Sequence, residues 1–164
     1  LIEGDSSSPH KNVDEAFLIT NKLDSSKYEI WYMSYNAKPK EWYRVDKFLH
    51  RVPYEEVQKV YADCDILLKT SLLESFSYPP IEMMATGGYV VALLNDGNKE
   101  YLEDGKNCLN YPNGDVEQAV QCIERIIYDS NLQNVLYTNG VKTAQSRDWE
   151  TIKDSIIYTY CSWP

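Results

Sequence analysis

The sequence predicts an α/β fold in which a parallel, doubly wound sheet is covered by helices on both faces. Two observations support this prediction. Short apolar runs alternate with segments of helical periodicity along the chain, and two runs, DILLKT and YVVALL, are apolar enough to be buried strands. In such a sheet, ligands bind beyond the carboxyl ends of the strands.

The first third of the chain predicts two strands and a helix. Residues 1–4 form a short strand, the polar loop DSSSPHK follows it, and helical spacing begins at Lys11. The apolar residues with this spacing are Val13, Ala16, Phe17 and Leu23. YEIWY, from Tyr28, alternates as a strand does.

The middle predicts two more strands around a helix. VDKFL, residues 45–49, follows the polar connection KPKEWYR. Pro53 suits the first turn of a helix. The apolar face of that helix holds Val57, Val60, Tyr61 and Cys64. DILLKT, from Asp65, then reads as a buried strand.

Prolines and glycines predict where the helix that follows DILLKT begins and ends. Pro79 and Pro80 can start a helix but not lie inside one, and the glycines at 87–88 end it. YVVALL is the next strand, NDGNKEYLEDGKN a loop with at most one helical turn, and CLNY a short strand. Residues 113–115 offer capping chemistry for a helix, and further helices are expected from about Asn131 and Asp148. The apolar face of the capped helix is Val116, Ala119, Val120, Ile123, Ile126 and Ile127.

Composition predicts one globular domain. The chain has 164 residues, of which 43% are hydrophobic and 25% charged. Its net charge of -9 argues against a nucleic acid or an anionic membrane surface as the main partner. There is no run of 18 apolar residues and no signal-like segment, so nothing in the sequence predicts a membrane span or export.

The cysteines indicate the cellular compartment of the protein, and the first residues indicate whether the chain is part of a longer protein. The four cysteines are scattered without a CxxC pair, and only two histidines occur, which predicts reduced cytoplasmic thiols rather than a zinc site. The chain opens LIEGDSSSPHK, without a methionine and already inside a strand. We therefore expect residues 1–164 to be a single domain excised from a longer protein.

Several common nucleotide and metal motifs are missing or weak. No GxGxxG follows the first strand, and no GxxxxGK[ST] occurs, so dinucleotide and P-loop sites lose their main support. Asp63-Cys64-Asp65 spells DxD, but it straddles a helix end and a strand start. We interpret Asp63 as a surface turn residue and Asp65 as a strand boundary, and predict no metal site.

The stretch ESFSYPPIEMMATGG, residues 74–88, is the most specific motif. It resembles the Glu-x7-Glu signature of retaining glycosyltransferases of the GT-B fold, and most closely that of family 4, whose usual form is E-[SG]-F-G-x-P-x-x-E-x-[ML]-A-x-G-x-P-V-V. The resemblance extends to LIEGD…K, to VDKFLHRVPYEEVQKVYADCDILLKTS, to YVVALLNDGNKEYLEDGKNCLNY and to WETIKDSIIYTY. It implies a Rossmann-like domain, the nucleotide-sugar-binding C-terminal half of a two-domain enzyme.

Physical chemistry also gives this stretch a role in binding. The helix opened by the two prolines would point free N–H groups toward the cleft, which favours a diphosphate. A carboxylate at the strand end and another inside the helix can each accept two hydrogen bonds from vicinal hydroxyls, worth about 1.5–3 kcal/mol each. The resemblance implies that Glu74 holds the donor sugar and Glu82 the ribose. It further implies that Ser75, Phe76 and Ser77 present backbone N–H groups.

Simpler interpretations of the two glutamates remain open. Without the surrounding pattern, Glu74 would be read as a loop charge and Glu82 as a solvated helix residue. A glycosidase also uses two carboxylates, but it would explain neither the helix start nor Lys11.

Lys11 is the second expected catalytic residue. It ends the polar loop where the family carries an Arg-x4-Lys pair, and a cation there would stabilise charge on the leaving diphosphate. The arginine position holds Asp5, so either Arg51 or His10 substitutes or the phosphate is held more weakly. A solvated helix lysine is the alternative for Lys11.

The resemblance also bears on five positions outside Glu74, Glu82 and Lys11. Arg51 and Val52 follow the third strand, where the family places its nucleobase, and Arg51 either stacks on the base or is incidental. Ser77 stands where glycine is usual, and Tyr78 either reaches the sugar or caps the helix. Glu100 matches a loop glutamate of the family, which is expected either to have a structural role or to support the residues that bind the ligand.

The sequence therefore predicts the donor-binding domain of a retaining hexosyltransferase that passes a sugar from a nucleotide to a polysaccharide or lipid-linked glycan. The resemblance implies front-face chemistry with an oxocarbenium-like transition state. The resemblance also implies that no metal or cofactor is needed, since in the GT-B fold a helix dipole and a cation take that role. The missing N-terminal domain would bind the acceptor, which leaves the fragment alone inactive. The intact enzyme is expected in the cytoplasm, free or peripheral to the inner face of the membrane.

Three other functions are alternatives for this sequence. A non-catalytic nucleotide-sugar-binding or regulatory module on the same fold is supported by Asp5 and Ser77. A flavodoxin-type receiver domain would need an acidic cluster after the first strand, where only isolated acidic residues occur. An epimerase on the same fold would act on the free donor without an acceptor.

Overall fold

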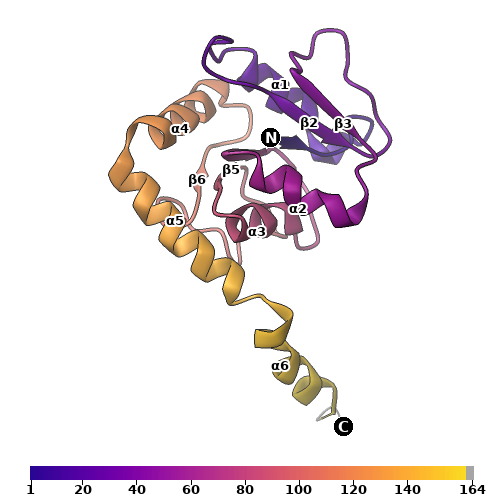
Figure 1. Cartoon of the computed structure of the whole chain (residues 1–164), viewed down its shortest axis with the longest axis vertical. Helices are drawn as coiled ribbons and strands as arrows, with labels where there is room; N and C mark the ends of the chain where they lie inside the picture. The colour runs from indigo at the N-terminus through magenta and orange to yellow at the C-terminus, as the bar shows by residue number, and fades with distance from the viewer. Residues whose placement is uncertain (162–164) are drawn as a thin grey trace.

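The centre of the protein is a six-stranded parallel sheet in the order β3-β2-β1-β4-β5-β6 (Figure 1). The structure is a computed structural model, and it describes residues 1–161. The strands are β1 Ile2–Glu3, β2 Trp31–Ser34, β3 Lys47–His50, β4 Ile66–Lys69, β5 Tyr89–Ala92 and β6 Leu109–Asn110. The predicted doubly wound α/β fold is confirmed.

Helices cover both faces of this sheet. They are η1 Pro9–Lys11 (a 3-10 helix), α1 Val13–Thr20, α2 Tyr54–Ala62, α3 Tyr78–Ala85, α4 Val116–Tyr128, α5 Ser130–Gln145 and α6 Trp149–Cys161. Buried residues of α1 and α4 belong to one apolar cluster and those of α2 and α3 to another, while α5 contributes to both. The sheet therefore separates two layers of helices.

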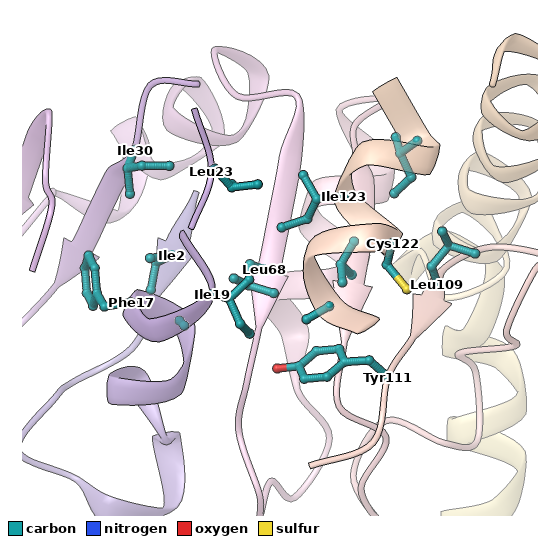
Figure 2. Packing of buried hydrophobic residues seen from close by; sticks show 14 of the residues in the cluster. Ile2, Phe17, Ile19, Leu23, Ile30, Leu68, Leu109, Tyr111, Cys122 and Ile123 are labelled. Atoms are coloured by element: carbon teal, nitrogen blue, oxygen red, sulfur yellow. The ribbon is translucent and has the colours of Figure 1, made fainter. Parts of the chain in front are cut away.

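The central strands are buried on both faces because neighbouring residues enter opposite clusters. On β4, Leu67 packs with the α2 and α3 cluster and Leu68 with the α1 and α4 cluster. On β5, Val90 and Val91 divide in the same way. Figure 2 shows Leu68 on the face covered by α1 and α4, together with Ile123 of α4. This explains why DILLKT and YVVALL lack polar alternation.

The strand order creates a crevice between β1 and β4. The chain runs outward from β1 through β2 to β3, and then returns to place β4 on the other side of β1. The connections that follow β1 and β4 therefore diverge to opposite sides at their carboxyl ends, which is where open α/β sheets bind ligands.

The second strand shows the largest difference from the predicted boundaries. It was expected at residues 28–32 but runs over Trp31–Ser34. The backbone N–H of Ile30 donates to Asp46 Oδ2 at 2.7 Å, and β2 begins one residue later in register with β1. The alternation of YEIWY therefore continues past Tyr32, which the short pattern did not show.

Smaller shifts occur at other ends. The first long helix begins at Val13 instead of Lys11, because Lys11 ends η1 and Asn12 takes a left-handed conformation with φ 50°. The fifth strand ends at Ala92, two residues before the apolar run does. The loop 95–107 closes hydrogen-bonded turns, as expected, without forming a helix.

Three remaining expectations concern the thiols, the membrane and the last helix. All four cysteines are free, and Cys108 and Cys122 are buried while Cys161 is exposed. Within residues 1–161, no helix combines the length and apolarity needed to cross a bilayer. The last helix, α6, projects away from the body of the domain (Figure 1).

Candidate functional site

A pocket of about 340 Å³ opens beyond the carboxyl ends of β1, β2 and β3, at the end of the sheet where open α/β folds bind ligands. Its wall includes three predicted site residues, Lys11, Arg51 and Val52, although they are far apart in the sequence. Asp5, which stands at the family's arginine position, also lines it. The structure thus brings the expected phosphate and nucleobase residues to one place.

A cluster of paired charges lies beside this pocket. Lys11 Nζ donates to Glu74 Oε1 at 2.8 Å, and Lys69 Nζ lies 3.2 Å from the same oxygen. Lys69 Nζ also donates to Glu3 Oε2 at 2.6 Å. These four side chains come from the ends of β1 and β4, from η1 and from the loop after β4. We call Glu3, Lys11, Lys69 and Glu74 the charge cluster.

The ion pairs decide the protonation of Glu74. Burial alone would raise the pKa of its carboxyl group, but the hydrogen bond from Lys11 and the charge of Lys69 outweigh it. The pKa of Glu74 is therefore held below its ordinary value. Its carboxylate stays ionised at neutral pH, ready to accept hydrogen bonds.

Glu82 lies on α3 in a different environment. Burial raises the pKa of its carboxyl group, and the nearby Glu3 carboxylate raises it further. A hydrogen bond from Tyr61 and the charge of Lys69 oppose the rise but do not cancel it. Glu82 therefore belongs to the same neighbourhood as the charge cluster, and is not a solvated helix glutamate.

Ser77 forms the start of α3. It is the N-cap residue, buried, with a left-handed φ of 63° that a non-glycine residue seldom adopts. The Tyr101 hydroxyl donates to its carbonyl oxygen. The cap is thus Ser77 and not Tyr78, which opens the helix with an exposed side chain. Ser75 is exposed, and the Phe76 ring packs at 5.4 Å from that of Tyr101.

Replacing Ser77 by glycine is expected to stabilise the fold by about 1 kcal/mol, because the left-handed conformation costs a non-glycine residue about 1–2 kcal/mol. The buried Ser77 hydroxyl also lacks a hydrogen-bond partner within residues 1–161. Urea unfolding measures the change. Ser75→Gly is the matched control, since Ser75 is exposed and has no positive φ. Equal effects of the two substitutions would show that the Ser77 backbone is unstrained.

Arg51 is already engaged elsewhere. Its Nε donates to the Tyr35 carbonyl at 3.2 Å, and its guanidinium lies 5.5 Å from the centre of the Tyr35 ring. Of the two proposed substitutes for the missing arginine, Arg51 lines the pocket while His10 is exposed on η1. Asp5 accepts hydrogen bonds from the backbone and side chain of Ser7, so it closes the turn after β1.

The loop after β5 packs against the segment that carries Glu74. Asn95 Nδ2 donates to the Ser71 carbonyl at 2.8 Å, and Gly97 packs against the backbone of Glu74. Glu100, in contrast, is exposed and pairs with Arg147 at 3.5 Å. Glu100 therefore forms a surface ion pair away from Glu74. The residue of this loop that contacts Glu74 is Gly97.

Two further expectations can be placed in the fold. Asp63 caps the end of α2 and Asp65 precedes β4. Both line a separate cavity of about 390 Å³ at the amino ends of the strands, away from the charge cluster. Across residues 1–161, no three His, Cys, Asp or Glu side chains are grouped as a metal site.

Sequence reasoning missed Lys69, Glu3 and Gly97. Lys69 is the only charged residue within the run ILLK of β4, and its side chain is 1% exposed. Glu3 likewise ends the short strand β1. A charge at the carboxyl end of a buried strand is the signal that could have identified both residues, because burial of a charge requires a partner. The contact of Gly97 had no such signal.

The sequence is similar to that of known proteins. Residues 44–143 match the family model of the glycosyl transferases group 1. A relative in Myxococcus xanthus, the O-antigen biosynthesis protein RfbC, is 30% identical over 112 residues, which are 66% of this chain and 8% of RfbC.

Solved structures share the fold at low identity. Anabaena HepE, in complex with UDP-glucose, superimposes with a TM-score of 0.83 at 23% identity, over 99% of this chain and 48% of HepE. The C-terminal domain of the group 1 glycosyl transferase LpcC from Francisella tularensis gives a TM-score of 0.70 at 18% identity, over 90% of this chain and 83% of that domain. The chain thus spans less than half the length of RfbC and of HepE.

Proposed function

The chain belongs to the glycosyl transferases of group 1, and from this premise we propose that it is the donor-binding half of a retaining glycosyltransferase. The observation that carries the proposal is the convergence of Lys11, Glu74 and Glu82 at the carboxyl ends of β1 and β4. Cations beside hydroxyl-binding carboxylates suit a nucleoside diphosphate sugar, which joins a diphosphate to two polyhydroxylated rings.

Each part of the donor has a matching group. The ionised Glu74 would hold the sugar hydroxyls, and Glu82 the two ribose hydroxyls. The N-terminus of α3 and Lys11 would hold the diphosphate. The backbone of residues 75–77 would contribute N–H groups there.

The base and the sugar would be bordered by other residues. Arg51 and Val52 line the pocket at the end where the base would lie. Tyr78, exposed at the start of α3, would contact the sugar.

The proposed reaction is sugar transfer with retention of configuration. As the bond between sugar and diphosphate breaks, negative charge grows on the leaving group, where Lys11 and the dipole of α3 stabilise it. These groups would make a metal ion unnecessary. Front-face attack by the acceptor on an oxocarbenium-like sugar would preserve the configuration.

The acceptor would be a polysaccharide or a lipid-linked glycan, bound by a preceding domain. RfbC is named for O-antigen biosynthesis, which is consistent with such an acceptor. Because the chain spans under half of HepE, we expect the isolated chain to bind the donor but not to turn it over. The whole enzyme would work in the cytoplasm or at the inner face of the membrane.

Calorimetric titration of the chain with uridine, guanosine and thymidine diphosphates, and with the three nucleosides, tests the donor site. UDP is the first to try, since HepE was solved with UDP-glucose. We expect one diphosphate to bind at least tenfold more tightly than its nucleoside, because charged hydrogen bonds contribute about 1.5–3 kcal/mol each. Lys11→Met should remove most of that difference.

Lys22→Met is the control for Lys11→Met, because Lys22 lies in an exposed ion pair with Glu117 outside the site. Equal affinity for nucleoside and diphosphate would contradict a phosphate-binding Lys11. If no nucleotide binds, the second candidate, a non-catalytic module, is favoured. Asp5 and Ser77, the two departures from the family pattern, are the observations that support it.

A further inference from the structure

Two lysines share one carboxylate oxygen in the charge cluster. Glu74 Oε1 lies 2.8 Å from Lys11 Nζ and 3.2 Å from Lys69 Nζ. The proposed function uses Lys11 and Glu74, but it gives Lys69 no role. A buried lysine is costly unless it is paired, so its presence at the end of β4 calls for an explanation.

The two lysines differ in freedom. The Lys69 side chain is 1% exposed and is anchored to Glu3 at 2.6 Å, so its ammonium group is fixed between Glu3 and Glu74. The Lys11 side chain is 24% exposed and lines the pocket. Lys11 can therefore swing from Glu74 into the pocket by rotating its side chain, whereas Lys69 has no such path.

Charge balance shows what such a movement requires. Glu3, Glu74 and Glu82 bring three carboxyl groups to a region that holds two lysines. If Lys11 turned to a diphosphate and Lys69 were absent, the Glu74 carboxylate, only 12% exposed, would lose both cations. An ionised carboxylate at that burial is costly without a partner.

We propose that Lys69 is a positioning residue: it is the permanent counter-ion of Glu74, and it thereby releases Lys11 to bind the diphosphate of the donor. Lys69 holds the Glu74 carboxylate in place while Lys11 moves. The proposal rests on the proposed function, since it assumes that a diphosphate enters the pocket. It assigns Lys69 an effect that passes through Glu74 and not through direct contact with the ligand.

The test compares the affinities of the chain for a diphosphate and for its nucleoside. The probe is whichever of uridine, guanosine or thymidine diphosphate binds the unmodified chain. In Lys69→Met, Lys11 is the only cation of residues 1–161 still paired with Glu74, so we expect diphosphate affinity to fall at least fivefold and nucleoside affinity to stay within twofold. Adding Glu74→Gln to this variant frees Lys11, and diphosphate affinity should return to at least its original value.

Distinct outcomes separate the alternatives. A purely structural Lys69 would lower both affinities together, or neither, and either result overturns the proposal. Failure of Glu74→Gln to restore diphosphate affinity also overturns it. A wild-type chain that binds the diphosphate no better than the nucleoside overturns the proposed function itself, and this is seen before any variant is made. Lys22→Met controls for loss of a lysine at an exposed position.

A second comparison does not need the single variant to fold. Circular dichroism shows whether Lys69→Met is folded; if it is not, Glu74→Gln is compared with Glu74→Gln/Lys69→Met. Because Lys69 acts through Glu74, removing it in the neutral Glu74→Gln background should change diphosphate affinity by less than twofold. A tenfold loss there would show that Lys69 contacts the ligand directly, and would overturn the proposal.

Discussion

Replacing Gly97 by alanine is expected to destabilise the fold by about 3 kcal/mol and to weaken nucleotide binding at least tenfold. A Cβ atom at Gly97 would lie 2.3 Å from the Glu74 carbonyl oxygen and 2.6 Å from its carbonyl carbon. Both are backbone atoms, so the contact cannot be relieved by a rotamer change. Overpacking of this kind costs about 1–3 kcal/mol, and the upper value applies where the surroundings are rigid.

The surroundings of Gly97 are rigid because its loop is fastened at several points. The Gly97 N–H donates to Asn95 Oδ1 at 3.0 Å, and Asn95 Nδ2 in turn donates to the Ser71 carbonyl. Asn98 Nδ2 holds the Leu93 carbonyl at 3.0 Å. The loop cannot retreat without losing these bonds, so the strain passes to Glu74 and moves its carboxylate away from the lysines.

Gly105→Ala is the matched control for Gly97→Ala. Gly105 has φ 70° and no atom within 4 Å of an added Cβ, so alanine there costs about 1 kcal/mol of backbone strain without a clash. Urea unfolding measures stability, and calorimetry with the nucleoside diphosphates measures binding. If Gly97→Ala were no more harmful than Gly105→Ala, the loop would not support Glu74.

The fold could be predicted from the sequence because its determinants are local. DILLKT and YVVALL lie at β4 and β5, and the two prolines occupy the first turn of α3, as expected of residues that can begin a helix but not continue one. The boundaries of β2 could not be predicted in the same way. Asp46 and the register with β1 set them, and both are contacts between distant segments.

The candidate site divides in the same manner. The stretch 74–88 carries a local pattern, so Glu74 and Glu82 could be selected from the sequence, and their roles remain predictions. Lys69 and Glu3 become site residues only because β1 and β4 are neighbours in the sheet, although 66 positions separate them in the chain. The spacing of apolar residues along the chain does not indicate which strands are neighbours in the sheet.

Glu82→Ala is expected to weaken binding of the nucleoside and of its diphosphate by the same factor, tenfold or more. The reason is that both ligands carry the ribose, and two charged hydrogen bonds to its hydroxyls contribute about 1.5–3 kcal/mol each. Lys11→Met, in contrast, should affect the diphosphate alone. Calorimetry with both ligands separates the two roles, and Glu124→Ala, at an exposed position of α4, is the control.

The raised pKa of Glu82 allows its functional role to be distinguished from a structural one. Burial raises this pKa, so the folded state binds the Glu82 proton more tightly than the unfolded chain does. At pH values above the pKa of Glu82 in both the folded and the unfolded state, the ionised carboxylate therefore lowers the free energy of unfolding. The amide oxygen of Glu82→Gln can still accept the hydrogen bond from Tyr61. We therefore expect this variant to have an equal or higher free energy of unfolding at pH 7 than the unmodified chain, while its affinity for the nucleoside falls. That outcome would indicate a residue that serves binding at the expense of stability. Loss of stability with unchanged affinity in Glu82→Gln would instead make Glu82 a structural partner of Tyr61.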